Sequence, residues 1–106
     1  MLFIDKSRIP ADVAVELSRV KSAVRWECID KADTVKIRSI FDQLDKSVIR
    51  SALVKEQKGL CAFCMRRIHE SPSTSIEHLK PIANDGNAAL DYRNMVACCD
   101  GGRSRS

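Results

Sequence analysis

The first half of the chain repeats apolar residues at helical spacing. Between residues 10 and 24 they recur at intervals of three and four, a stripe that predicts an amphipathic helix. A weaker stripe of the same kind predicts a second helix, built on Val35, Ile40, Phe41 and Leu44. A third occupies residues 48–53, with Asp45 placed to begin that helix as its N-cap. We therefore expect residues 1–58 to form a helical region whose apolar stripes pack a core.

The second half has a different pattern. From residue 59 onward Gly, Pro, Cys, His and Asn concentrate and the apolar runs shorten. Short stretches over residues 65–68 and 76–79 predict strands. So short a segment cannot bury a sufficient hydrophobic core of its own. This composition is therefore typical of a small fold organised around a metal ion. We expect residues 59–106 to be such a segment.

Composition and charge narrow the class of protein. The chain has 106 residues, of which 44% are hydrophobic and 30% charged, so one small folded domain is expected. No apolar run approaches the roughly 18–20 residues of a membrane span, and the start resembles no secretory signal, so we expect a cytoplasmic protein without a membrane partner. The net charge of +4 lies entirely in residues 46–106. This excess fits a surface that faces nucleic-acid phosphates, or simply a mildly basic solvated face.

Four of the five cysteines lie in the second half, at positions 61, 64, 98 and 99. Without a secretory signal disulfides are not expected, and metal binding or thiol chemistry is the better explanation. Cys61 and Cys64 have the C-x-x-C spacing that holds zinc in a tight turn, and also the spacing of a redox pair. A redox pair would open a helix after a strand, whereas this pair follows a predicted helix, so zinc is favoured. Cys28 stands alone and is expected to be a buried small apolar residue.

Two further groups of polar residues follow the cysteine pair. Glu77 and His78 are adjacent and lie in a predicted strand, where they would point to opposite faces. A local bend is needed for both to act at one site, and the alternative is two unrelated surface residues. Asn94 then precedes Cys98 and Cys99, which would return the chain to the first pair. Neighbouring side chains diverge, so these two cysteines are not expected to bind one metal together.

The order of these motifs resembles the HNH endonuclease family. The shared pattern is a C-x-x-C pair, a Glu-His-x-x-Pro segment, and an Asn followed by Cys-x-Gly-Gly, here over residues 59–102. More narrowly, it is similar to the HNH nucleases found with retron and Septu-type antiphage systems. The resemblance implies an α+β fold in which the helical region 1–58 precedes a ββα-metal finger of the treble-clef kind over residues 59–106.

The resemblance also implies a role for each motif residue. His78 would be the general base that takes a proton from water, and Asn94 would orient its ring. Glu77 would be an oxygen ligand for a catalytic Mg²⁺ or Mn²⁺. The ligands of a structural zinc would be Cys61, Cys64 and Cys99. The contacts to nucleic acid would be Lys80 and Arg93, with Arg66 and Arg67 as weaker candidates.

The sequence departs from the family pattern after its Gly-Gly pair. The family places a fourth zinc-binding cysteine downstream, and this sequence has none there, so we expect a finger incomplete at its C-terminus. The fourth ligand would then be His69, Cys98 with distortion, water or a second chain. The resemblance implies a metal-dependent nuclease acting on DNA, as an antiphage effector beside a partner ATPase. The alternatives are a non-catalytic zinc-stabilised module that binds nucleic acid or a partner, and an inactive remnant.

Overall fold

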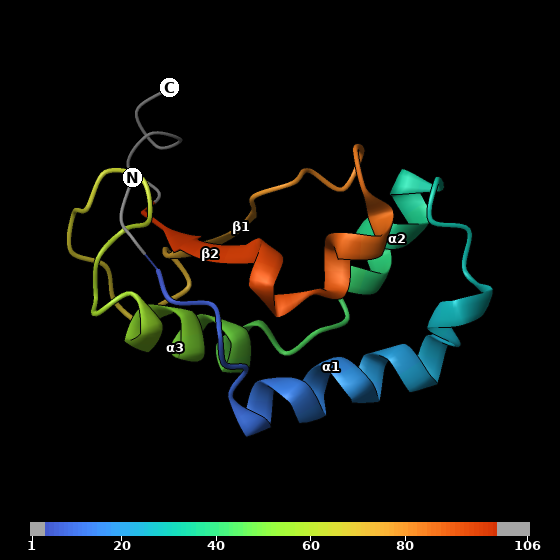
Figure 1. Ribbon diagram of the computed structural model, residues 1–106, viewed down its shortest axis with the longest axis horizontal. Helices are drawn as coiled ribbons and strands as arrows, with labels where there is room; N and C mark the ends of the chain where they lie inside the picture. Colours follow the sequence, from blue (N-terminus) through green and yellow to red (C-terminus); the bar gives the residue numbers. More distant parts are fainter. Residues whose placement is uncertain (1–3, 100–106) are drawn as a thin grey trace.

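The computed structural model describes residues 4–99 (Figure 1). Within this range, the α-helices precede the strands, and the elements are α1 Ala11–Val24, α2 Thr34–Phe41, α3 Lys46–Glu56, β1 Ser75–His78 and β2 Met95–Cys98. Short 3₁₀ helices lie between them, at η1 Trp26–Cys28, η2 Gly86–Leu90 and η3 Tyr92–Asn94. The α+β class and the helical first half are confirmed. The segment that would hold the finger's helix, including Gly101 and Gly102, lies outside the described residues.

The helix ends follow local chemistry. Asp45 is the N-cap of α3, as predicted, and its carboxylate accepts a hydrogen bond from the amide of Ser47. Asp33 caps α2 in the same way. Helix α1 ends at Arg25, which adopts the left-handed conformation with φ 56°.

Two expectations about burial are wrong. Val35 is 81% exposed, because α2 turns Ile37, Ile40 and Phe41 to the core and leaves Val35 on its outer face. Cys28 is exposed as well, because the short turn η1 buries Trp26 and directs Cys28 outward.

The two strands form an antiparallel pair that joins distant motifs. In its register Ser75 lies opposite Cys98 and His78 lies opposite Met95. Figure 1 shows the pair beside α3 and above α1, with α2 beside the loop that connects the strands. The strand expected over residues 65–68 is reduced to one antiparallel bridge, from Arg67 to Leu60.

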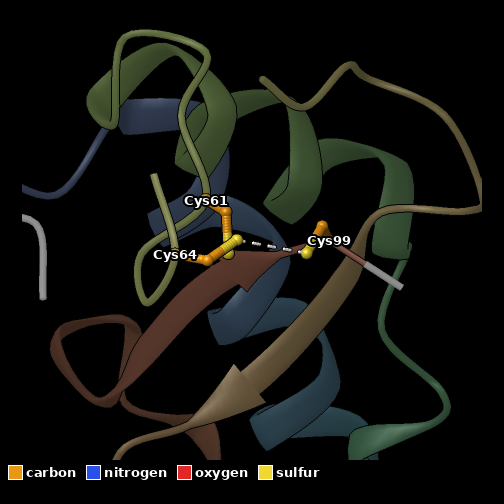
Figure 2. A group of neighbouring side chains, drawn as sticks. All are labelled: Cys61, Cys64 and Cys99. Carbon is orange, nitrogen blue, oxygen red and sulfur yellow. Dashed lines mark hydrogen bonds between the residues drawn. The ribbon is translucent and has the colours of Figure 1, made fainter. Parts of the chain in front are cut away.

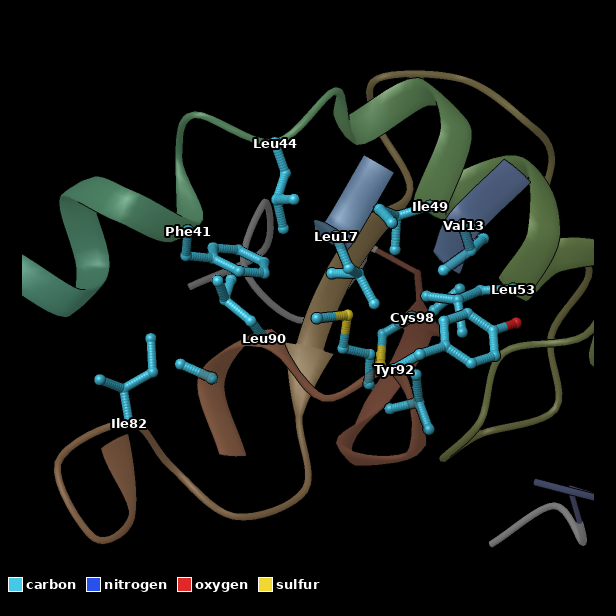
Figure 3. Close-up of a cluster of buried hydrophobic side chains, with 14 of the residues drawn as sticks. Val13, Leu17, Phe41, Leu44, Ile49, Leu53, Ile82, Leu90, Tyr92 and Cys98 are labelled. Atoms are coloured by element: carbon cyan, nitrogen blue, oxygen red, sulfur yellow. The ribbon is translucent and has the colours of Figure 1, made fainter. Parts of the chain in front are cut away.

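One hydrophobic core serves both halves of the chain. Helix α1 contributes Val13 and Leu17, and α3 contributes Leu53, while Tyr92 and Cys98 enter from the second half (Figure 3). The helical region and the segment after residue 59 are therefore packed as one unit. Among the described residues, no helix combines the length and the apolar character that crossing a membrane requires.

Glycine is required where η2 meets the segment before α2. A Cβ atom at Gly86 would overlap the backbone carbonyl oxygen of Lys31. The two backbones therefore approach as closely as they do only because this residue has no side chain.

Candidate metal centre and active site

The first pair of cysteines lies in a tight turn, which we call the cysteine turn (residues 61–65). Helix α3 ends at Gln57, and positive φ angles at Lys58 and Gly59 then reverse the chain. The amide of Cys61 donates to the carbonyl of Arg66 at 2.7 Å, and the amide of Met65 donates to the carbonyl of Cys61 at 3.0 Å. These bonds place both thiols on one side of the turn.

The third sulfur arrives from the end of β2. Figure 2 shows Cys99 facing Cys61 and Cys64, and the three Sγ atoms all lie within 4.8 Å of one another. The Sγ atoms of Cys64 and Cys99 are 3.5 Å apart. Tetrahedral zinc with bonds of about 2.3 Å would separate its sulfur ligands by about 3.8 Å. The three cysteines therefore form a group that can hold a metal ion and whose spacing suits zinc.

The backbone around this group favours a thiolate at Cys61. Burial acts to raise the pKa of that thiol, but the amides of Cys64, Cys99 and Phe63 point toward the sulfur and outweigh it, lowering the pKa to about 6. At Cys64 the amide of Arg66 acts to lower the pKa, but the neighbouring sulfurs and desolvation outweigh it and the pKa is raised. One thiolate is thus prepared before any ion is present, and the repulsion between sulfurs is of the kind that a cation relieves.

The two candidates for a fourth ligand stand outside the sulfur group. Cys98 is only 5% exposed and belongs to the hydrophobic core, where burial raises its pKa to about 12. His69 is exposed and lines a small pocket of about 80 Å³ together with Cys99. The structure thus brings together the three predicted zinc ligands and adds neither candidate to them.

Gln57 is a residue of this site that the sequence did not reveal. It is 2% exposed, and its side-chain amide donates to the carbonyls of Leu60 and Ala97, each at 2.8 Å. Its carbonyl oxygen accepts from the amide of Ala97, also at 2.8 Å. Gln57 thereby continues the hydrogen-bonding pattern of β2 along its outer edge and fixes Cys99 relative to Cys61. The only local signal was a glutamine placed shortly before the cysteine turn.

His78 lies at the last position of β1 and is half-buried. Its Nε2 atom is 2.9 Å from the carbonyl oxygen of Ala89, and its ring meets Phe41 edge-on at 4.6 Å. A carbonyl only accepts, so Nε2 carries the hydrogen in the neutral ring and Nδ1 keeps the lone pair. Desolvation lowers the pKa of His78 and outweighs the hydrogen bond to Ala89, which acts to raise it; nearby Arg38 and Lys46 add to the lowering, so the neutral ring is favoured at pH 7.

Asn94 is buried and holds the loop that follows His78. Its Oδ1 accepts from the amide of Lys80 at 2.8 Å, and its Nδ2 donates to the carbonyls of Lys80 and Ala88 at 3.0 and 3.2 Å. Among the described contacts, the amide is thus engaged with backbone groups rather than with the His78 ring. Asn94 thus acts on His78 through the loop that follows it, and not by the direct hydrogen bond that the resemblance implies.

Lys80 and Arg93, the two main predicted phosphate contacts, share one hollow. Lys80, Arg93 and Asn94 line a cavity of about 380 Å³, together with Asp85 and Asp91. Both cationic side chains are exposed, and the Arg93 guanidinium contacts Asp91 at 3.2 Å. The structure therefore gathers Lys80, Arg93 and Asn94, although the positive charge of Arg93 is partly balanced.

A second metal site at Glu77 has no support among residues 4–99. The cysteine group is the only set of three or more His, Cys, Asp or Glu side chains in that range close enough to share an ion. Glu77 is half-buried in β1, opposite Val96. We therefore derive no step through a catalytic Mg²⁺ or Mn²⁺.

Comparison with known proteins identifies no similar protein. No family model matches the chain, and neither the curated proteins nor the solved structures give a match.

Proposed function

We propose that the chain is an HNH-type endonuclease that hydrolyses phosphodiester bonds in DNA. The observation that carries the proposal is the pairing of β1 with β2. It sets Leu79 against Asn94, whose carbonyl accepts from the Leu79 amide at 2.8 Å, so His78 and Asn94 meet at one end of the sheet. The cysteine group occupies the other end. Motifs 16 positions apart in the sequence are thus neighbours, in the order that the resemblance requires.

The chemistry assigned to the chain's own residues is proton transfer and positioning. The Nδ1 atom of neutral His78 takes the proton from the water that attacks phosphorus. The hydrogen bond from Nε2 to Ala89 fixes the ring and its tautomer, while Asn94 holds the backbone of the next turn. Lys80 and Arg93 offer positive charge to the phosphate from the shared cavity. An antiphage role beside a partner ATPase, and a requirement for Mg²⁺ or Mn²⁺, rest on the order of motifs alone.

The test is nicking of supercoiled plasmid DNA in the presence of Mg²⁺ or Mn²⁺. We expect the native chain to cleave and His78→Ala to lose cleavage. Because the His78 ring packs on Phe41, the matched variant is His78→Gln, whose amide can still donate to Ala89 but is not basic. Val35→Ala, at an exposed position on α2, controls for purification and handling. Cleavage by His78→Gln at the native rate would remove the assignment of the general base.

A second candidate function is a non-catalytic, zinc-stabilised module that binds nucleic acid or a partner. It is favoured by the enclosure of the His78 ring between Phe41 and Ala89, and by the full engagement of the Asn94 amide group in backbone contacts. This candidate predicts about one zinc per chain and salt-sensitive DNA binding without cleavage. Metal analysis and fluorescence anisotropy measure the two properties directly. A chain that holds no zinc and folds equally well with a chelator contradicts it.

A further inference from the structure

The cysteine turn presents large apolar side chains to solvent. Phe63 is 51% exposed and Met65 is 52% exposed, one on each side of the exposed Cys64. Arg66 and Arg67 follow directly and are exposed as well. These four residues, Phe63, Met65, Arg66 and Arg67, are called the turn surface below. An exposed aromatic ring next to two guanidinium groups is the combination used to hold unpaired nucleotides.

The fold fixes Phe63 in this exposed position. Cys61 and Ala62 are buried, at 1% and 0% exposure, and the Ala62 amide donates to the carbonyl of Ala97 in β2 at 3.1 Å. The next residue of the turn therefore faces outward. These backbone bonds hold residue 63 on the outer side of the turn, so no refolding of the turn is needed to present its ring to a ligand.

The charge around the turn favours nucleic acid over protein as its partner. Between residues 58 and 69 the sequence has three basic residues, Lys58, Arg66 and Arg67, and no acidic residue. Phe, Met and Arg are also common at protein interfaces, but such surfaces do not require a one-signed charge. A base inside a duplex is already stacked on both faces, whereas an unpaired base has a face to offer to Phe63.

We propose that the turn surface binds single-stranded nucleic acid, with a base stacked on Phe63 and phosphates contacting Arg66 and Arg67. The inference rests on the proposed function in so far as both require a nucleic acid. It adds a second contact at the Cys98 end of the sheet, whereas His78 lies at the Met95 end. The strands β1 and β2 are each about 10 Å long, a length that a few nucleotides of a bound single strand cover. The proposal gives the site a preference for unpaired nucleotides over intact duplex.

The test measures binding of zinc-loaded protein to labelled oligothymidylate by fluorescence anisotropy, without added Mg²⁺. The reference ligand is an abasic deoxyribose-phosphate oligomer of equal length. We expect Phe63→Ala to weaken binding of oligothymidylate by roughly 5- to 150-fold and to leave binding of the abasic oligomer unchanged. Phe63→Trp should retain the native affinity, and Phe63→Leu, which keeps apolar bulk without an aromatic face, should behave as Phe63→Ala does.

The arginines give an independent measurement. Each of Arg66→Gln and Arg67→Gln should weaken both oligomers and reduce the slope of log affinity against log salt by about 0.7. The matched control is Val35→Ala, which removes an exposed apolar side chain on α2. Zinc content is measured for every variant, so that a change in affinity is compared only between proteins with the same metal site.

Three outcomes overturn the inference. The first is that Phe63→Ala and Val35→Ala bind oligothymidylate with equal affinity. The second is that the native protein binds duplex more tightly than single strand. The third is that the native protein binds neither oligomer, a result that would assign the turn surface to a protein partner. The proposed function fails differently, when plasmid cleavage is absent or survives in His78→Gln. Equal affinity of Phe63→Ala and Val35→Ala for oligothymidylate, found together with native cleavage of plasmid, therefore refutes this inference alone.

Discussion

Replacing Gln57 by leucine should damage both the stability of the fold and its affinity for zinc. The substitution keeps the approximate volume and removes all three side-chain hydrogen bonds of Gln57, which join the start of the cysteine turn to β2. Ala97 is fully buried, so its amide would be left without a hydrogen-bond partner and water could not replace the lost one. Its carbonyl would still accept from the amide of Ala62. Leu60 is only half-buried, and its carbonyl is open to partial hydration.

The magnitude follows from these environments. A buried amide without a partner costs about 1–3 kcal/mol, and each of the two other lost bonds contributes about 1 kcal/mol, for a total of about 3–5 kcal/mol. Small domains are stable by about 5–15 kcal/mol, so Gln57→Leu removes a large share. With a urea m value of about 1.5 kcal/mol/M, the midpoint should fall by about 2–3 M.

The assay is urea unfolding at fixed zinc concentration, followed by competition with a chelator to measure zinc affinity. The matched control is Gln43→Leu, the same chemical change at an exposed glutamine. Gln57→Glu adds a test of direction, because the introduced carboxylate can accept from the Ala97 amide but not donate to the two carbonyls. Its protonated form can donate, so its deficit in stability should shrink as the pH is lowered.

The reasoning is refuted if Gln57→Leu unfolds within about 0.5 kcal/mol of Gln43→Leu, since distant surface substitutions differ by no more than that. A normal zinc affinity in a destabilised Gln57→Leu would refute the part of the argument that gives this residue a role in aligning the cysteines.

Three further predictions concern the rest of the fold. Gly86→Ala should destabilise the protein by about 1–3 kcal/mol in urea unfolding, because the new methyl group meets the Lys31 carbonyl; native-like stability would show that the two segments can separate without cost. The Glu16 carboxylate, which bonds a neighbouring arginine and accepts from the Asp45 amide at 2.6 Å, has its pKa lowered from 4.5 to about 2. Because the pKa is lowered in the folded state, the carboxylate's contribution to stability is complete above about pH 4.5 and is lost as the pH falls toward 2. After allowance for solvent screening, Glu16→Gln should therefore cost about 1–2 kcal/mol at pH 7 and much less at pH 2. Equal losses at the two pH values in urea unfolding would contradict this. Removal of zinc by a chelator should lower the urea midpoint of the native protein and have little effect on Cys64→Ser, whose zinc content by metal analysis should already be reduced.

Local patterns in the sequence predicted the parts of the fold that are locally determined. The N-cap at Asp45 and the long stripe of α1 follow from neighbours within one or two turns. The grouping of Cys61 with Cys64 follows from their spacing in a tight turn, and Cys99 joins them as expected. The error at Val35 arose in α2, where eight residues give too few repeats to fix which face is buried.

Tertiary contacts decided what the sequence could not. Gln57 follows the last turn of a helix, a position that usually faces solvent, and only the return of β2 beside it buries the side chain. Asn94 was expected to bond His78, but the loop between the strands brings Lys80 and Ala88 to its amide instead. The path of that loop depends on its packing against α2, which no local pattern encodes.

The separation of Cys64 and Cys99 in the chain has a consequence for the unfolded state. These ligands are 35 positions apart, so an ion that joins them closes a loop containing β1, the connecting segment and β2. By the chain-entropy estimate used for covalent cross-links, closing a loop of this length removes about 4 kcal/mol of conformational freedom from the unfolded chain. Zinc would then favour folding even if it added no contact to the native structure. The same closed loop contains Glu77, His78 and Asn94. If a fluctuation separates β1 from β2, the closed loop limits how far the two strands can move apart, so less conformational entropy is lost when they pair again.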